Sequence, residues 1–280
     1  MMRVEEAADE EIGLIGPAMM GSPGQAFQFG VWMHLRHVGA WGPTGKLAAH
    51  QDSLRLQRGY LSNRAVEVVG NYHEDGYAHI RGLIPEEVAR AFMAGLKAAT
   101  GGKSIPVNAP QHYPAVLMRP AFDVGPGVFQ PLDYFLWGLT PIMSELIGRE
   151  VLPSYGYFRV YRKGDRCRVH SDRPSSEHGV SMTMEYSDGE IWDLQMGKER
   201  TETLYPLADD FGSDPYESIG MEIGDAVLYQ ATHYPHGRID PNPNAWSAHL
   251  FLFYVDRDGP YRNCAFDEKA DFEKVSFNFV

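Results

Sequence analysis

The chain has 280 residues, 44% of them hydrophobic and 22% charged, and a formal net charge of −12. This composition is ordinary for a globular protein, and the sequence offers neither an apolar run long enough for a membrane span nor the basic face of a nucleic-acid binder. The acidic N-terminus has no apolar signal core and only two cysteines occur, so we expect a cytoplasmic protein whose partner is a small molecule.

Residues 1–63 are predicted to form an arm that packs on the main domain, which we expect over residues 64–280. The arm is rich in glycine, methionine and aromatic residues, as in GPAMMGSPGQAFQFGVWMHL, and then turns polar with some helical spacing. So many aromatic residues are not typical of a solvated tail. The arm is therefore expected to cover part of a site.

The first part of the main domain is predicted to contain two long helices and one strand. The sequence before Asp75-Gly76 suggests the end of a helix, the dipeptide itself a turn, and residues 77–80 a strand. Pro85 suits the first position of a helix, and an apolar stripe at helical spacing follows it. A second helix is predicted over 131–148, with a kink or a division at Pro141.

From about residue 151 onward, short β-rich runs alternate with turn signals. The runs are YGYFRVYR, RCRVHSD, HGVSMTMEYS, EIWDLQM, TETLYPL, ESIGMEIG, DAVLYQAT and AWSAHLFLFYV. Several of them alternate in side-chain character with the period of two that half-buried strands show. Helices followed by many short strands predict an α+β fold that is mainly β, a sandwich or jelly roll, and argue against a parallel sheet built from βαβ units.

His170 and Asp172 form the first candidate site. They are separated by one residue, and residues two apart on a strand point to the same face, so an imidazole and a carboxylate converge on one point. A metal needs a third ligand, and two histidines, His233 and His236, follow the predicted strand in GDAVLYQATHYPHGR. Because a jelly roll stacks strands that are distant in sequence, either histidine can meet the first pair.

Two histidines and one carboxylate occupy one face of an octahedral iron ion and leave three positions open for substrate and oxygen. Zinc competes for such a site, although catalytic zinc more often takes three histidines or two histidines and a glutamate. An HxD pair alone occurs often by chance, and the alternative without a metal is a β-sandwich binding module with structural histidines. The β-rich context and the distal histidine favour the metal.

Three stretches within residues 65–256 resemble the iron(II)- and 2-oxoglutarate-dependent dioxygenases, particularly the branch of prolyl hydroxylases and small-molecule hydroxylases. They are EDGYAHIRGLIPEEV, FRVYRKGDRCRVHSD and GDAVLYQATHYPHGR. The resemblance implies a double-stranded β-helix, or jelly roll, with flanking helices on one side. It implies that His170, Asp172 and His236 bind the metal, because the family often places its distal histidine after a proline. His233 is the rival third ligand.

The same resemblance implies an enzyme that uses Fe(II), 2-oxoglutarate and O2 and releases succinate and CO2. Such an enzyme hydroxylates, desaturates or cyclises an unactivated C–H of a small organic substrate. No catalytic residue beyond the metal ligands is required, because the metal and the cosubstrate supply the chemistry. Related halogenases carry a small residue in place of the carboxylate, so Asp172 argues against halogenation.

The distal carboxylate of 2-oxoglutarate needs donors from the protein. Tyr161 precedes His170 at the offset where family members often carry a tyrosine for this purpose. The Lys or Arg that the family places beyond its distal histidine is missing, since the window WSAHLF offers only Ser247 and His249 as polar groups. Arg238 is the preferred replacement, and the alternatives are His249, Arg168 and Arg173.

The substrate contacts are predicted from what surrounds the ligands. Arg173 and Glu177 follow the HxD sequence directly, and with His233 they are candidates for substrate binding; His178 is more simply structural. Trp192, Trp246 and Tyr186 either line a pocket or belong to the core. The missing basic residue supports an alternative function, a cupin-like metal enzyme that does not use 2-oxoglutarate.

Overall fold

The computed structural model describes residues 66–101 and 114–268, so the predicted arm over residues 1–63 lies outside the described residues. In the described part, no helix is both long and apolar enough to cross a membrane. The elements follow in this order: β1 (Glu67–Val69), α3 (Tyr72–Asp75), β2 (Tyr77–Arg81), α4 (Glu86–Ala99), β3 (Phe122–Val124), α5 (Pro131–Ile147), β4 (Val151–Arg162), β5 (Cys167–His170), η2 (Pro174–Ser176), β6 (His178–Tyr186), β7 (Leu194–Gly197), β8 (Tyr216–Ile219), β9 (Ala226–Tyr229), β10 (His236–Arg238), β11 (Trp246–Asp256) and η3 (Arg262–Glu268).

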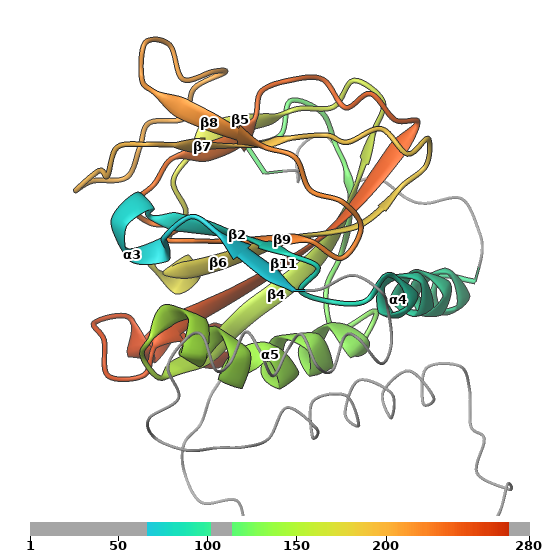
Figure 1. The fold of residues 1–280 in the computed structure, drawn as a ribbon. Helices are drawn as coiled ribbons and strands as arrows, with labels where there is room; N and C mark the ends of the chain where they lie inside the picture. Colours follow the sequence, from blue (N-terminus) through green and yellow to red (C-terminus); the bar gives the residue numbers. More distant parts are fainter. Residues whose placement is uncertain (1–65, 102–113, 269–280) are drawn as a thin grey trace, which may run out of the picture.

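Two antiparallel sheets lie face to face, and the two long helices α4 and α5 cover the outer face of the larger one (Figure 1). The larger sheet has the strand order β1-β2-β9-β6-β11-β4-β3, and the smaller one β5-β10-β7-β8. The chain passes repeatedly from one sheet to the other, as in a double-stranded β-helix. This confirms the predicted mainly β fold with its helices on one side.

The central strands β4 and β11 divide their side chains between two different environments. Phe158 and Leu250 point outward and belong to the large apolar core under α4 and α5. Tyr157 and Phe251 belong instead to a cluster on the inner face, between the sheets. The alternation follows from the pleat of a strand, so the same two strands bind the helices on one side and enclose the sandwich interior on the other.

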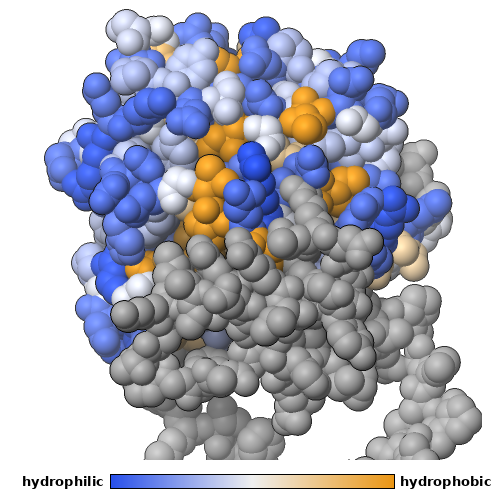
Figure 2. All heavy atoms as spheres, in the orientation of Figure 1, coloured by the Kyte–Doolittle hydropathy of each residue, from blue (hydrophilic) through white to orange (hydrophobic). Residues whose placement is uncertain are grey.

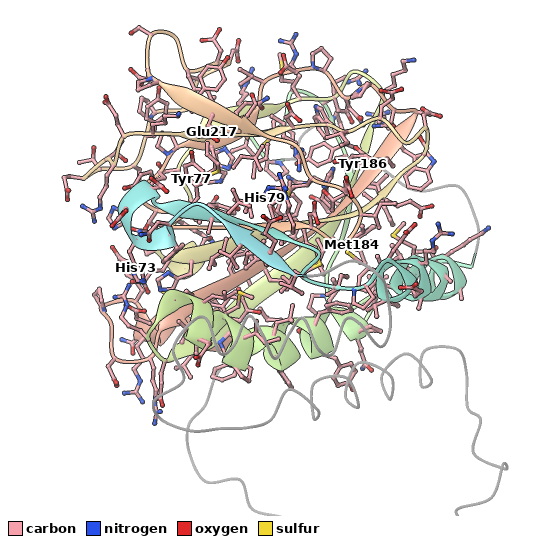
Figure 3. The ribbon with its side chains drawn as sticks, in the orientation of Figure 1. His73, Tyr77, His79, Met184, Tyr186 and Glu217 are labelled. Atoms are coloured by element: carbon pink, nitrogen blue, oxygen red, sulfur yellow. The ribbon has the colours of Figure 1, made fainter. Side chains whose placement is uncertain are left out.

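A hydrogen bond joins the two sheets between β2 and β8. Figure 3 labels Tyr77 and Glu217 on these strands, and the Tyr77 hydroxyl donates to Glu217 Oε2 over 3.0 Å. A cleft of about 360 Å³ opens beside them. The surface of the described residues in this view is mainly hydrophilic, with smaller hydrophobic patches between (Figure 2).

Most predicted elements are present, with differences at their boundaries. Strand β2 extends the predicted strand by one residue, and Pro85 is the N-cap of α4 rather than its first residue. The helix end predicted before the turn at Asp75-Gly76 is confirmed, but the helix is short and a strand precedes it. A strand, β1, and the four-residue helix α3 occupy this stretch, and Gly76 ends α3 in the left-handed conformation.

Two further differences have clear physical reasons. Helix α5 is not divided at Pro141, because Leu139 and Ile142 on either side of the proline are buried in the core and hold the helix against the sheet where one backbone hydrogen bond is lost. The predicted strand TETLYPL is wrong. Residues 198–215, which include it, form an irregular connection from β7 to β8. Within it, Pro206 has no N–H to offer a ladder.

The predicted turn at Gly224-Asp225 generates a test of the fold. Gly224 has φ of +86°, and a Cβ there would lie 2.3 Å from the Ile84 carbonyl oxygen, whereas Gly189, with φ of +77°, has nothing within 4 Å. Gly189→Ala should lose about 1 kcal/mol of unfolding free energy from the backbone conformation alone, and Gly224→Ala at least about 2 kcal/mol more from the clash. Chemical denaturation measures both; equal losses would contradict the packing described.

Candidate metal centre

Three ligand-type side chains meet between the sheets, and strand register brings them together. His170 ends β5 and His236 begins β10, and the two residues are directly opposite in the antiparallel pairing of these strands. Asp172 Oδ1 lies 3.4 Å from His170 Nε2, and Asp172 Oδ2 lies 3.6 Å from His236 Nε2. The ligand atoms of the three residues all lie within 4.8 Å of one another.

Backbone carbonyls orient both imidazoles. His170 Nδ1 donates to the Arg168 carbonyl over 2.8 Å, and His236 Nδ1 donates to the Tyr234 carbonyl over 3.1 Å. These bonds place the ring protons on Nδ1, so each Nε2 presents its lone pair toward Asp172. Metal-binding histidines are held in this way, with one ring nitrogen on a backbone acceptor and the other on the metal.

The environment keeps His236 and Asp172 in the protonation states that bind a metal. Burial lowers the pKa of His236 from its usual value to about 4, and the charge of His170 lowers it further against the opposing effect of Asp172. Burial raises the pKa of Asp172, but the neighbouring side chains His170, His236 and Arg173 outweigh burial and hold this pKa below its usual value. A neutral imidazole and an ionised carboxylate are the forms that bind a metal.

The donor set fits a divalent first-row metal with open coordination positions. Two imidazole nitrogens and one carboxylate on one side are the ligands of non-haem iron(II) sites. His233, the rival third ligand, is not part of the group, because its Nδ1 lies 3.1 Å from the Thr201 carbonyl on the irregular connection after β7. The geometry therefore favours His236 as the third ligand.

The three ligands line a narrow cavity of about 30 Å³ between the sheets. This volume holds one or two water molecules, so a larger ligand requires lining side chains to move. The cavity is otherwise lined by aromatic and aliphatic side chains and by two arginines. The lining is Val116, Tyr157, Arg159, Tyr161, Cys167, Leu194, Tyr229, Gly237, Arg238, Phe251 and Phe253.

Arg238 is the predicted cosubstrate cation, and the structure places it in this cavity. Its side chain is 1% exposed, its guanidinium lies 4.7 Å from the centre of the Trp192 ring, and it donates to the Trp192 carbonyl. Its Nη2 lies 3.3 Å from His249 Nδ1. Both hydrogen-bond partners are neutral, and among the described residues no carboxylate forms an ion pair with it.

His249 and Tyr161 lie around Arg238. Burial, and then the charge of Arg238, lowers the pKa of His249 far below its usual value, so the imidazole is neutral. Because an arginine only donates, His249 Nδ1 accepts and its proton is on Nε2, which has no hydrogen-bond partner among the described residues. Burial raises the pKa of Tyr161, so its hydroxyl stays protonated and can donate.

Arg159 also lines the cavity, and sequence reasoning missed it as a cation. It is 3% exposed, and Asp123 holds it in a bidentate pair, Nε to Oδ1 at 2.6 Å and Nη2 to Oδ2 at 2.8 Å. The signal was available, because Arg159 shares the inner strand face with Tyr157 and Tyr161. Asp123 neutralises its charge locally, which distinguishes it from Arg238.

The remaining predicted residues are distributed over several places. Arg173 is outside the cavity lining, and its guanidinium lies 4.7 Å from the centre of the Tyr155 ring. Glu177 lies outside the cavity lining, and its Oε2 accepts from the Asp256 amide. Arg168 is paired with Asp209 and is also outside the lining.

The aromatic candidates and His178 have structural contacts. Trp192 supports Arg238 as described, and the Tyr186 hydroxyl donates to the Met221 carbonyl. Trp246 packs against the core on the helix side. His178 is buried with both ring nitrogens occupied, one 2.5 Å from the Tyr72 hydroxyl and the other 2.9 Å from Asp256 Oδ1. These bonds account for His178 without a metal.

The lowered pKa of His236 predicts an acid sensitivity of the metal-free protein. Between pH 6.5 and about 4 the unfolded chain takes up a proton at this histidine and the folded chain does not, so stability falls as the pH falls. The slope is up to about 1.4 kcal/mol per pH unit. Denaturant unfolding in the presence of a chelator, at pH 7 and 5.5, should show this loss and show it reduced in His236→Gln. Identical profiles of the two proteins would contradict the shift.

Comparisons with known proteins bear on the fold. No protein-family model matches the sequence, and no curated protein matches it. The epimerase SnoN, solved in complex with Fe3+, alpha-ketoglutarate and nogalamycin RO, has a TM-score of 0.50 at 12% identity, over 66% of this chain and 81% of that one. HygX from Streptomyces hygroscopicus, solved with nickel, 2-oxoglutarate and hygromycin B, also gives 0.50 at 12% identity, over 67% and 85%. The chain therefore has the fold of these 2-oxoglutarate-binding proteins, as the sequence resemblance implies.

Proposed function

We propose that this chain is a non-haem iron(II)- and 2-oxoglutarate-dependent dioxygenase that oxidises an unactivated C–H of a small organic substrate. The observation that carries the proposal is that two kinds of binding group line one cavity. A two-histidine, one-carboxylate set and a buried arginine without a carboxylate partner among the described residues line the same space. The shared fold is consistent with it, since SnoN and HygX were solved with alpha-ketoglutarate or 2-oxoglutarate bound.

The charge of Arg238 supports a carboxylate ligand. A buried cation is costly unless an anion is paired with it, and the neutral contacts of Arg238 compensate only part of that cost. A dicarboxylate that reaches from the metal to Arg238 would supply the missing anion. Guanidinium groups bind carboxylates through paired N–H donors, which suits this position.

Unpartnered polar atoms on β11, one of them in His249 beside Arg238, support the same ligand. His249 Nε2 and Ser247 Oγ are buried, on the inner face of β11, and neither has a hydrogen-bond partner among the described residues. Buried donors left unpaired are rare in native proteins and call for a ligand or water. We assign Arg238, His249 and Tyr161 to the cosubstrate, and His170, Asp172 and His236 to the metal.

The bound metal and cosubstrate would supply oxidation of a C–H bond, coupled to decarboxylation of 2-oxoglutarate to succinate and CO2. The protein's own residues position these groups and exclude water. His170, Asp172 and His236 would hold the metal through three ligand atoms, the number that non-haem iron(II) sites of this type use. The aromatic wall of β4 and β11 keeps the site apolar. Of the predicted substrate residues, we retain Arg173, because Glu177 and His233 are engaged elsewhere.

The metal assignment predicts the effect of three substitutions. His170→Ala and Asp172→Ala should each lower Fe(II) affinity at least about 100-fold, because each removes a ligand rather than an outer contact. His233→Gln is the matched control, since the same chain segment carries it and its ring contacts Thr201; it should leave the affinity unchanged. Anaerobic metal titration measures all three. Unchanged affinity in the alanine variants would refute the metal centre.

The cosubstrate assignment predicts the effect of Arg238→Gln. Loss of a buried charge partner costs about 2–5 kcal/mol, so the dissociation constant of 2-oxoglutarate should rise about 30-fold or more while Fe(II) affinity is retained. Arg168→Gln, at a paired arginine outside the cavity, is the control. Calorimetry on the Co(II)-loaded protein measures the binding. No 2-oxoglutarate binding and no succinate from the wild type would favour the metal enzyme that does not use 2-oxoglutarate.

A further inference from the structure

Arginine and aromatic side chains form two similar stacks on the large-sheet wall of the cavity. In the inner stack, Tyr157 lies against Phe251, with ring centres 4.9 Å apart, and the Arg159 guanidinium lies 5.0 Å from the Tyr157 ring centre. Because Asp123 pairs with Arg159 through two hydrogen bonds, this stack is internally neutralised. It is a structural part of the wall.

The outer stack repeats the arrangement next to the cavity, and of its members Phe253 lines the cavity. Tyr155 lies against Phe253, with ring centres 4.6 Å apart, and the Arg173 guanidinium lies 4.7 Å from the Tyr155 ring centre. Unlike Arg159, Arg173 is exposed to solvent. Its place in the chain, directly after the candidate ligand Asp172, keeps this cation next to the metal centre.

One short turn fixes both Tyr155 and Arg173. Pro174 restricts the Arg173 backbone to an extended conformation, and the Ser176 amide donates to the Arg173 carbonyl over 2.8 Å. Ser176 Oγ, which is fully buried, lies 2.7 Å from the Tyr155 hydroxyl. The guanidinium is therefore held over a ring that is itself immobilised, and little side-chain entropy remains to be lost when it binds a ligand.

We propose that Tyr155 and Arg173 form an anion-recognition element, and that the substrate is a small molecule with an apolar body and one carboxylate or phosphate group. This inference rests on the proposed function, because the bound molecule is a substrate only if the chain is the proposed dioxygenase. A stacked guanidinium offers its N–H edge to such an anion in bidentate geometry. The apolar body would lie against Phe253 and the neighbouring cavity wall. Tyr155 is a positioning residue that acts through Arg173.

Matched probes test the element without any turnover. The probes are 3-phenylpropionate, 2-phenylethyl phosphate and the neutral 3-phenylpropanamide, titrated calorimetrically into the full-length metal-free protein. At least one anion should bind about tenfold or more tightly than the amide, and the tighter of the two identifies the anionic group. Arg173→Gln should abolish this preference, and Arg173→Lys should retain only part of it. Equal binding of all three probes, or a preference that survives Arg173→Gln, overturns the proposal.

Further variants test whether Tyr155 acts by positioning Arg173 and whether the anion binds at Arg173 rather than at Arg238. Tyr155→Phe keeps the ring but loses the hydroxyl that contacts Ser176, so it should retain most of the preference. Tyr155→Leu should reduce the preference about two- to fivefold, the size expected of a cation–π contact at an exposed site. If Tyr155 has a purely structural role, its replacement would lower the affinities for the anions and for the amide equally. An unchanged ratio of these affinities would therefore contradict the positioning role. A preference lost in Arg238→Gln and kept in Arg173→Gln would assign the anion to the inner site. Failure of the proposed function is detected separately, by the metal and 2-oxoglutarate titrations.

Discussion

The pairing of β10 with β5 is the constraint on which the site depends. Directly opposite residues on antiparallel strands have Cβ atoms about 5 Å apart, so two histidines in register can share one metal. A shift of one residue would turn His236 to the other face of its sheet. Strand β10 is held on both sides, because it also pairs with β7, where His236 is opposite Met196. The candidate centre is thus a consequence of strand register more than of loop conformation.

The two faces of the larger sheet carry different kinds of side chain. The outer face packs with α4 and α5 into an extensive apolar core, and this burial provides most of the stabilisation available to the fold. The inner face carries polar groups that a core would not tolerate, including His249, Ser247 and Arg159. Unsatisfied polar atoms and a buried cation persist between the sheets because the core on the other face stabilises the sheet that carries them.

The cavity contains two arginines, and they differ in how the surrounding residues compensate their charge. Asp123 compensates Arg159, so its charge is satisfied within the fold. Arg238 has aromatic, carbonyl and imidazole contacts that hold its position and leave its charge largely uncompensated. In this arrangement the resting protein bears the cost of a buried charge, which a bound carboxylate would offset.

The sequence by itself determined the elements with strong periodicity, which are α4, α5 and the mainly β second half, and it identified the HxD pair. The pair converges although β5 ends at His170, because the Asp172 amide donates to the Ala231 carbonyl beyond the strand. The sequence did not determine the irregular stretch after β7, where tertiary contacts replace the predicted strand, or the length of helix α3. The choice between His233 and His236 also depended on register, because both follow the same strand and only pairing with β5 aligns one of them with His170. Arg238, Arg159 and Arg173 are alike in sequence. Only the tertiary structure decided which is neutralised, which is buried without a carboxylate partner and which faces solvent, because charge compensation depends on neighbours that are distant along the chain.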